Sequence, residues 1–147
     1  MKHPFAVPTR LPDDLTQVRA YWRSLLRGSA AMPFWDDLAL TALPGLAGRL
    51  LLIDVFERPE RFRCNTVGGD IVTTAVEGEF LDELRLASPF EFLRAQCSAT
   101  VEAAAPTAFR REASGSSTAT SKGYARLLLP MWGEGHVGML LGVVAFD

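Results

Sequence analysis

The stretch YARLLLPMWGEGHVGMLLGVVAF, residues 124–146, places two runs of strand-forming residues on either side of the short turn Gly133-Glu134-Gly135. Alternate residues of a strand point to opposite faces. In the second run both faces are apolar: one carries Val137, Met139, Leu141 and Val143, and the other carries Leu140, Val144 and Phe146. Full burial stabilises each such side chain by roughly 1.5 to 3 kcal/mol. The pattern therefore predicts a central strand that is covered on both faces.

The segment RLLLIDVF, residues 49–56, has the same two-sided apolar pattern. We expect both segments to lie at the centre of one antiparallel sheet. Helices from the middle of the chain are expected to cover one face, and an N-terminal helix or a second subunit the other. This predicts an α+β fold: a five-stranded antiparallel sheet with helices on one face and an N-terminal amphipathic helix.

The remaining strands are expected at RFRCNTV (61–67), PTAFRRE (106–112) and YARLLLPMW (124–132). Residues 70–75 and 79–84 are expected to form two short helices. A longer helix is predicted over residues 88–105, because Ser88 and Glu91 have the spacing of a capping box and Pro89 suits a first helical turn. The Ser/Thr-rich residues 114–123 are expected to form a flexible loop or the weakly paired end of a hairpin.

Residues 12–27 are predicted to form an amphipathic helix that follows an N-terminal tail, residues 1–11. Its apolar stripe is Leu15, Val18, Trp22 and Leu25. We expect this stripe to form a homodimer interface, although packing on the chain's own sheet satisfies the same pattern. A separate row holds Arg19, Arg23 and Arg27. We interpret the row as a solvated face, with contact to an acidic partner as the alternative.

The size and composition of the chain limit the function classes. A chain of 147 residues is most simply one domain, here residues 12–147. The two cysteines, Cys64 and Cys97, show no disulfide framework or zinc-site spacing. The N-terminus has no secretory pattern, and no apolar run approaches the ~20 residues of a membrane span, so we expect a cytoplasmic protein. Its 15 basic and 17 acidic residues argue against general attraction to nucleic acid.

Several segments resemble a known family. They are Arg61-Phe62-Arg63 with Val67-Gly68, the run FLDEL at 80–84, and RLLLP at 126–130 with Gly135 and the terminal apolar strand. Together with AYWRSLLRG and LLLIDV, they resemble the single-domain PAS family common in alphaproteobacteria. The chain departs from the family pattern at Cys64 and Asn65, where an aromatic and a basic residue are usual. The resemblance implies a five-stranded antiparallel sheet flanked by helices, a small internal cavity in many members, and sensing or protein contact rather than catalysis. Because no kinase, cyclase or DNA-binding segment follows Asp147, we expect a sensed signal to pass to another protein.

Cofactor chemistry finds no support in the residues. A flavin photosensor of this class needs a reactive cysteine in an Asn-Cys-Arg-Phe type helical motif, whereas Cys64 lies in a predicted strand and Cys97 on the apolar stripe of a predicted helix. A haem sensor commonly needs an axial histidine on a helix that faces the cavity. His3 lies in the tail and His136 at the start of the last strand. Haem and flavin are therefore not expected, and both cysteines are interpreted as inert core residues.

Two functional hypotheses remain open. In the first, the protein is a sensor that binds a small molecule between the inner face of the sheet and the helices. Its polar candidates are Asn65, Tyr124 and Arg126, and its apolar wall candidates are Phe62, Phe92 and Met139. In the second, side chains fill that space and the protein is an interaction module that uses the N-terminal helix and the exposed sheet face. A small cavity enzyme using Glu79, Asp82, Glu83 and His136 is the less favoured third reading.

Overall fold

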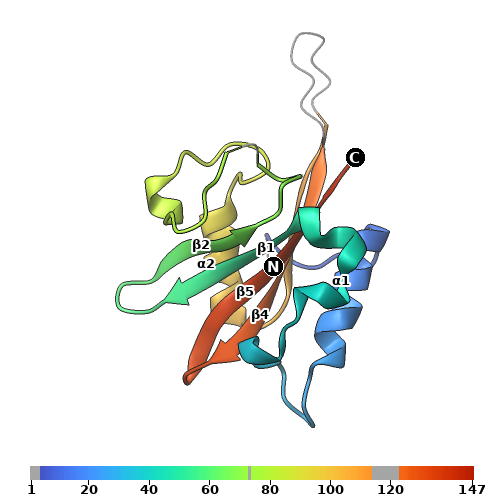
Figure 1. The fold of residues 1–147 in the computed structure, drawn as a ribbon, viewed down its shortest axis with the longest axis vertical. Helices are drawn as coiled ribbons and strands as arrows, with labels where there is room; N and C mark the ends of the chain where they lie inside the picture. The colour runs from blue at the N-terminus through green and yellow to red at the C-terminus, as the bar shows by residue number, and fades with distance from the viewer. Residues whose placement is uncertain (1–3, 73, 114–122) are drawn as a thin grey trace.

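The computed structural model describes residues 4–72, 74–113 and 123–147. It is an α+β domain in which one sheet separates two helical layers (Figure 1). The five strands are antiparallel and lie in the order β2-β1-β5-β4-β3. The predicted fold class and strand number are confirmed.

The elements follow the chain in a simple order. The α-helices and strands are α1 (Asp13–Ser24), β1 (Leu50–Phe56), β2 (Arg61–Val67), α2 (Leu93–Ala103), β3 (Thr107–Arg111), β4 (Tyr124–Gly133) and β5 (His136–Phe146). Short 3₁₀ helices are η1 (Trp35–Asp37), η2 (Leu40–Ala42), η3 (Pro44–Arg49) and η4 (Leu81–Glu83). Among the described residues, no helix has the length and apolar character that crossing a membrane requires.

The central position of β5 is confirmed, because β5 pairs with β1 on one side and β4 on the other. Val143 and Val144 point to opposite faces and are both fully buried. Phe146 was expected to be covered but is 38% exposed, because it lies at the last position of the strand beyond the helical layers. A register shift near Met131 and Trp132 also puts Val137 on the face opposite to Met139.

We call the face of the sheet that packs against α2 the inner face and the face that packs against α1 the outer face. The core of the inner face includes Leu51, Ile53, Phe62, Cys64, Leu93, Cys97, Leu128, Leu140 and Val144. The core of the outer face includes Leu15, Val18, Trp22, Leu46, Leu50, Leu127, Leu129, Leu141 and Val143. One sheet therefore supports two separate apolar cores, as the two-sided strands predicted.

Helix α1 covers the outer face from within the same chain. Leu15, Val18 and Trp22 are buried against β4 and β5, and Leu25 at the helix end is half-buried. The structure thus shows the intramolecular alternative for this stripe, whose side chains are not exposed as a dimer seam. Homodimer formation stays a prediction, and this stripe is no longer its proposed interface. The helix ends at Ser24, earlier than predicted, and the chain then turns through Gly28 in a left-handed conformation.

The helices predicted after β2 required correction. Helix α2 begins at Leu93, and its N-cap residue, Phe92, makes no side-chain capping bond, so the predicted capping box of Ser88 and Glu91 is wrong. The Glu91 carboxylate instead accepts hydrogen bonds from Arg111 and Tyr124. The helix expected over 79–84 is reduced to η4, and the described residues of 70–75 form no helix. The predicted loop lies, apart from Gly123, outside the described residues, as does His3.

Other parts of the chain cover both edges of the sheet. At the β3 edge, the Ala108 amide donates to the Phe5 carbonyl at 2.9 Å. At the β2 edge, the Cys64 amide donates to the Glu79 carbonyl at 2.9 Å, and its carbonyl accepts from Gly78 at 2.7 Å. Unpaired edges invite association with strands of other molecules. Both edges of the sheet therefore have backbone partners from within the chain, whereas part of the outer face does not pack against α1.

Candidate functional site

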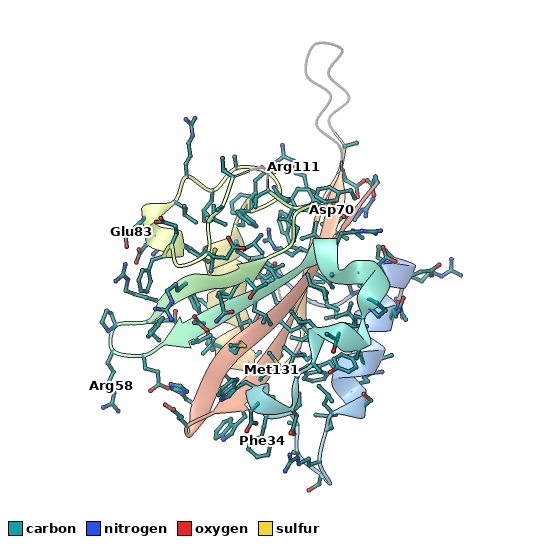
Figure 2. All side chains as sticks on the ribbon, viewed as in Figure 1. Phe34, Arg58, Asp70, Glu83, Arg111 and Met131 are labelled. Atoms are coloured by element: carbon teal, nitrogen blue, oxygen red, sulfur yellow. The ribbon has the colours of Figure 1, made fainter. Side chains whose placement is uncertain are left out.

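A groove of about 700 Å³ lies where α1 leaves the outer face of the sheet uncovered. The end of β1, the turn that follows it and the middle of β2 form one side, and η1 with the β4–β5 hairpin forms the other. Figure 2 shows Arg58 projecting from the tip of the turn between β1 and β2. The residues that line the groove are Trp35, Asp54, Val55, Phe56, Glu57, Arg58, Arg63, Asn65, Gly133, Glu134, His136, Gly138 and Met139.

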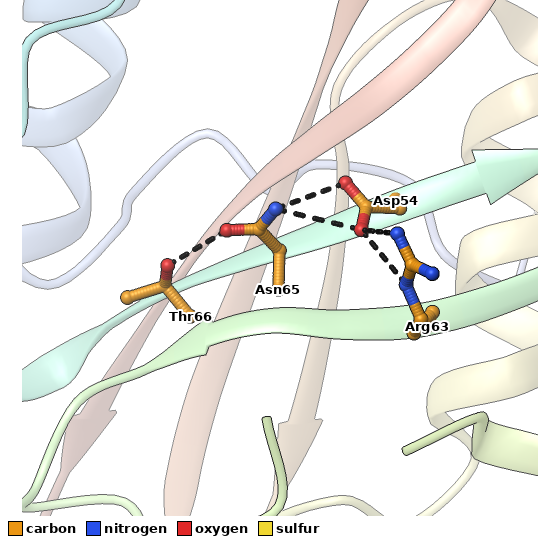
Figure 3. Close-up of polar contacts among 4 residues, drawn as sticks. All are labelled: Asp54, Arg63, Asn65 and Thr66. Atoms are coloured by element: carbon orange, nitrogen blue, oxygen red, sulfur yellow. Dashed lines mark hydrogen bonds and ion pairs between the residues drawn. The ribbon is translucent and has the colours of Figure 1, made fainter. Parts of the chain in front are cut away.

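The Asp54 carboxylate organises the polar part of the groove (Figure 3). Arg63 donates to Oδ2 of Asp54 from Nε at 3.1 Å and from Nη2 at 2.9 Å. Asn65 donates from Nδ2 to the same carboxylate at 3.2 and 3.4 Å. Thr66 donates to the Asn65 side-chain oxygen at 2.8 Å, which fixes the orientation of the amide. The side chains of Asp54, Arg63 and Asn65 therefore form one cluster in which hydrogen bonds hold the donors and acceptors in place. We call Asp54, Arg63 and Asn65 the polar cluster.

The strand geometry explains why these residues meet. Asp54 is opposite Arg63 in the antiparallel pair of β1 and β2, and cross-strand partners lie on the same face of a sheet. Between the pairs Ile53–Cys64 and Leu52–Thr66 the register shifts, so that Asn65 has no partner on β1. Such a bulge re-aims the local side chains. The bulge leaves Asn65 exposed beside Asp54, while the next apolar residue, Val67, returns to the inner core.

The opposite wall of the groove depends on a close approach between Trp35 and Gly133. A Cβ atom at Gly133 would lie 2.5 Å from Cδ1 and 2.9 Å from Nε1 of Trp35, so a side chain at this position displaces the indole. The ring of Trp35 is 47% exposed. At the hairpin, His136 Nδ1 lies 2.9 Å from the Gly133 carbonyl oxygen, which ties the imidazole to the turn. The hairpin therefore holds an aromatic surface facing the solvent.

Aromatic rings also support the arginines near the polar cluster. The Arg63 guanidinium lies 4.9 Å from the centre of the Phe56 ring and 5.9 Å from that of Phe80. The Arg61 guanidinium lies over the Phe80 ring, 3.8 Å from its centre. Stacking of this kind is typical of arginine on aromatic faces and limits its rotamers. Arg63 is thus held in place by both Asp54 and Phe56, although its side chain is 40% exposed.

The six ligand residues predicted from the sequence do not form one site. Asn65 and Met139 line the groove on the outer face. Phe62 is buried in the inner core, and Phe92, predicted as a cavity wall, is 63% exposed at the start of α2. Tyr124 and Arg126 are fully buried on β4. The residues predicted for one internal site are therefore divided among the outer groove, the buried inner side of the sheet and the exposed start of α2.

The space between the sheet and α2 contains a buried polar network. Arg126 donates to Gln96 Oε1 at 2.7 Å and to the carbonyls of Pro89 and Glu91 at 2.7 and 2.8 Å. Gln96 donates to Thr107 at 3.1 Å, whose hydroxyl lies 2.6 Å from that of Thr100. The fully buried guanidinium makes no ion pair with any described residue, and burial lowers the Arg126 pKa to about 10. The arginine and its partners therefore occupy the part of this space around Gln96 with a connected hydrogen-bond network.

The cysteines are buried and unpaired, as interpreted from the sequence. Burial raises the pKa of Cys64 to about 11, and burial also raises the pKa of Cys97. A thiol that holds its proton in this way is a poor nucleophile and a poor metal ligand. Within the described ranges, no group of three or more His, Cys, Asp or Glu residues is arranged to hold a metal ion.

The structure separates the residues of the enzyme hypothesis. His136 lines the groove, whereas Asp82 and Glu83 both pair with Arg61 beside a smaller hollow of about 240 Å³. The guanidinium of Arg61 holds the Asp82 pKa below its ordinary value through a hydrogen bond and its charge. Asp82 and Glu83 are therefore partners of Arg61 and do not line the groove that His136 lines.

Sequence reasoning overlooked Asp54, Arg63 and Trp35. Asp54 carries the clearest signal, because it is a single charged residue within the apolar run LLLIDVF. A carboxylate in a strand next to the sheet centre requires a partner, and the following strand supplies arginine and asparagine. Trp35 had no comparable signal, since its position depends on contact with a distant hairpin.

Comparison of the chain with models of protein families, with curated proteins and with solved structures finds no match.

Proposed function

We propose that this chain is a non-catalytic sensory domain with PAS-like architecture, which binds a small molecule in the groove and passes the signal to a partner protein. One observation carries the proposal: a groove of about 700 Å³ joins exposed aromatic side chains to the fixed polar cluster. Ligand sites commonly have volumes of about 300 to 1,000 Å³, with apolar walls and a few oriented polar groups.

The groove replaces the internal space in which the sequence hypothesis put a ligand. Arg126 and Gln96 occupy the region between the sheet and α2 and bond to each other and to nearby carbonyls. A ligand there would displace a buried guanidinium from its acceptors, which is costly because a buried charge needs compensation. The open groove requires no such rearrangement.

The lining of the groove indicates the class of ligand. Trp35, Phe56 and Met139 offer surfaces for a flat apolar ring. Arg63 and Asn65 offer donors for a carboxylate or amide oxygen, with their positions fixed by Asp54. A small aromatic molecule with one acidic or amide group satisfies both sides of the groove.

The five-stranded antiparallel sheet with flanking helices is consistent with the PAS resemblance, which supports a sensory role. The separation of His136 from Asp82 and Glu83 supports a function without catalysis. Because a sensory domain acts through a change in contact, we infer that an occupied groove alters the surface around Trp35 and the β4–β5 hairpin.

An interaction module without a small ligand is the second candidate. It is favoured by the buried polar network around Arg126, where the sequence hypothesis put a ligand, and by exposed aromatic side chains near the groove. These are Phe34, Trp35, Phe56 and Trp132. Phe34 and Trp132 are joined by a strand-like bridge, so they belong to one surface. Exposed tryptophan with neighbouring arginine is typical of the residues that dominate protein interfaces.

The test compares three probes in NMR titrations: benzoate, benzamide and the uncharged ring compound toluene. We expect saturable shifts in the amides of Asp54, Asn65 and Gly133 with benzoate or benzamide, and weaker shifts with toluene. Asn65→Ala and Trp35→Ala are expected to weaken binding about tenfold each, which corresponds to about 1.4 kcal/mol.

Two variants serve as controls. Phe92→Ala removes an exposed aromatic ring outside the groove, and Gln17→Ala removes an exposed amide on α1. Neither is expected to change probe binding. Shifts that are absent, or that change equally in all four variants, would contradict the small-molecule site. Native mass spectrometry that detects a partner protein and no small molecule would favour the interaction module.

A further inference from the structure

The arginine row of α1 contains one paired and two unpaired members. Arg27, beyond the helix end, donates to both carboxylate oxygens of Asp37 at 2.9 and 2.7 Å. Arg19 and Arg23 make no ion pair or side-chain hydrogen bond with any described residue. They are four positions apart, which puts them on the same side of the helix. Solvation of an exposed face, as interpreted from the sequence, accounts for Arg23 but not for Arg19.

Arg19 is unusual because part of its guanidinium is shielded from water. The Nε atom of Arg19 is buried, and it has no hydrogen-bond partner among the described residues. Burial, followed by the charge of Arg23, lowers the Arg19 pKa below its ordinary value. A donor without an acceptor and a neighbouring like charge both destabilise the folded chain. An anion bound between the two arginines offsets the repulsion between their like charges.

The two arginines line a small hollow of about 170 Å³ on the surface of α1. Thr9 and Leu11, from the segment that precedes the helix, form one side, and Thr16 and Ala20 complete it. The Thr16 hydroxyl makes only a long contact, 3.5 Å, to the Leu11 carbonyl. The hollow therefore gathers two guanidinium groups and two hydroxyl groups, and no carboxylate lines it.

We propose that this hollow binds an oxyanion of the phosphate type, with Arg19 and Arg23 as its cationic donors and Thr9 and Thr16 as hydroxyl donors. Arginine is suited to this role because its planar guanidinium donates several hydrogen bonds to a tetrahedral or carboxylate anion. The small size of the hollow fits one phosphoryl group. The site lies on α1, is separate from the groove of the proposed function, and stands independently of it.

The experiment titrates inorganic phosphate into the full chain at constant ionic strength, with chloride as the replaced anion. The observed signals are the Nε–H resonances of the arginine side chains in proton–nitrogen NMR spectra. We expect saturable shifts for Arg19 and Arg23. Constant ionic strength is needed because screening alone changes the environment of exposed arginines.

Three variants locate the site. Arg19→Gln and Arg23→Gln are each expected to weaken phosphate binding about tenfold, the effect of one lost charge-assisted hydrogen bond. Arg85→Gln is the charge-matched control, because Arg85 is exposed and does not line the hollow. Equal weakening in all three variants, or shifts that do not saturate, would overturn the proposal. Two independent arginine variants keep the test decisive if one of them folds poorly.

A second titration with phenyl phosphate distinguishes the source of the phosphoryl group. If phenyl phosphate binds more tightly than inorganic phosphate, with the same dependence on Arg19, the hollow binds a phosphate monoester of a larger molecule. Equal binding of the two indicates a site for the free anion. Both results support the oxyanion site, whereas phenyl phosphate binding that persists in Arg19→Gln and Arg23→Gln contradicts it.

Discussion

Trp22 of α1 donates a 2.9 Å hydrogen bond from its indole Nε1 to the carbonyl oxygen of Pro130 in β4. Proline lacks the amide proton needed in a fully paired strand. Strand β3 pairs with β4 only up to Thr107–Leu128, so Pro130 lies beyond the end of that neighbour. The indole supplies a donor for a carbonyl that β3 does not reach. The helix is therefore fixed to the sheet by a directional bond as well as by apolar contact.

This bond predicts the effect of Trp22→Phe. Phenylalanine keeps most of the ring contact but leaves the Pro130 carbonyl without its donor. We expect a loss of about 1 to 3 kcal/mol in the free energy of unfolding, the usual cost of a buried polar group left unsatisfied. Denaturant unfolding followed by circular dichroism measures it. Trp132→Phe, at an exposed indole, is the control. Equal losses in the two variants would show that the bond to Pro130 contributes little.

The buried network around Arg126 predicts a second stability effect. Gln96→Leu removes the acceptor of Arg126 Nε and the donor to Thr107. Because the guanidinium stays buried, we expect a loss of about 2 to 4 kcal/mol in the free energy of unfolding. The matched control is Gln17→Leu at an exposed position of α1, which is expected to have little effect. A Gln96→Leu protein as stable as the wild type would show that another group, such as water, compensates Arg126.

The sheet was predictable because burial leaves a direct pattern in the sequence. The alternation in β1 and β5 shows that both faces of each strand are apolar, and only interior strands satisfy that condition. The start of α2 was not predictable in this way. The capping pattern of Ser88 and Glu91 is local, whereas the Glu91 carboxylate is taken by Arg111 and Tyr124 from distant strands. Tertiary contacts thus overrode a local signal.

The candidate site was predicted only in part for a similar reason. Asn65 and Met139 were expected at an internal site on the inner face, whereas both line the groove on the outer face. Arg126, expected to be a ligand residue, is a polar residue in an apolar strand, a pattern shared by binding residues and buried structural residues. The difference lies in Gln96 and the carbonyl of Pro89, which satisfy it from other parts of the chain. Sequence spacing does not contain that information.

The β4–β5 hairpin predicts a stabilising substitution. Glu134 and Gly135 both have positive φ, at 54° and 85°. Two-residue hairpin turns with positive φ at both positions favour asparagine followed by glycine. Glu134→Asn is therefore expected to raise the free energy of unfolding by about 0.5 to 1 kcal/mol, because asparagine tolerates this conformation better than glutamate.

Thermal or denaturant unfolding measures this gain. Gly135→Ala is the opposing control and is expected to destabilise the chain, since alanine at positive φ is strained. Because Glu134 also lines the groove, probe titrations with Glu134→Asn show whether the turn geometry is preserved. A less stable Glu134→Asn protein would contradict the proposed strain at this turn.

Cys64 predicts a pH dependence of stability in the alkaline range. Burial raises its pKa from an ordinary value of 9.0 to about 11 in the folded chain. Above pH 9 the unfolded chain releases this proton while the folded chain retains it, so the folded state binds more protons and stability falls with rising pH. The stabilisation is fully present below about pH 9 and is lost between about pH 9 and pH 11.

The measurement compares wild type with Cys64→Ala by denaturant unfolding at several values between pH 8 and pH 11. Cavity formation lowers the stability of Cys64→Ala by an amount that does not vary with pH, whereas the thiol titration affects only the wild type. The advantage of the wild type is therefore expected to shrink by about 2 kcal/mol across the window, since one pKa unit corresponds to 1.36 kcal/mol. Other groups that titrate in this range act on both proteins and cancel in the difference. Parallel curves for the two proteins would show that the Cys64 thiol titrates alike in the folded and unfolded states, contrary to its burial in the core of the inner face.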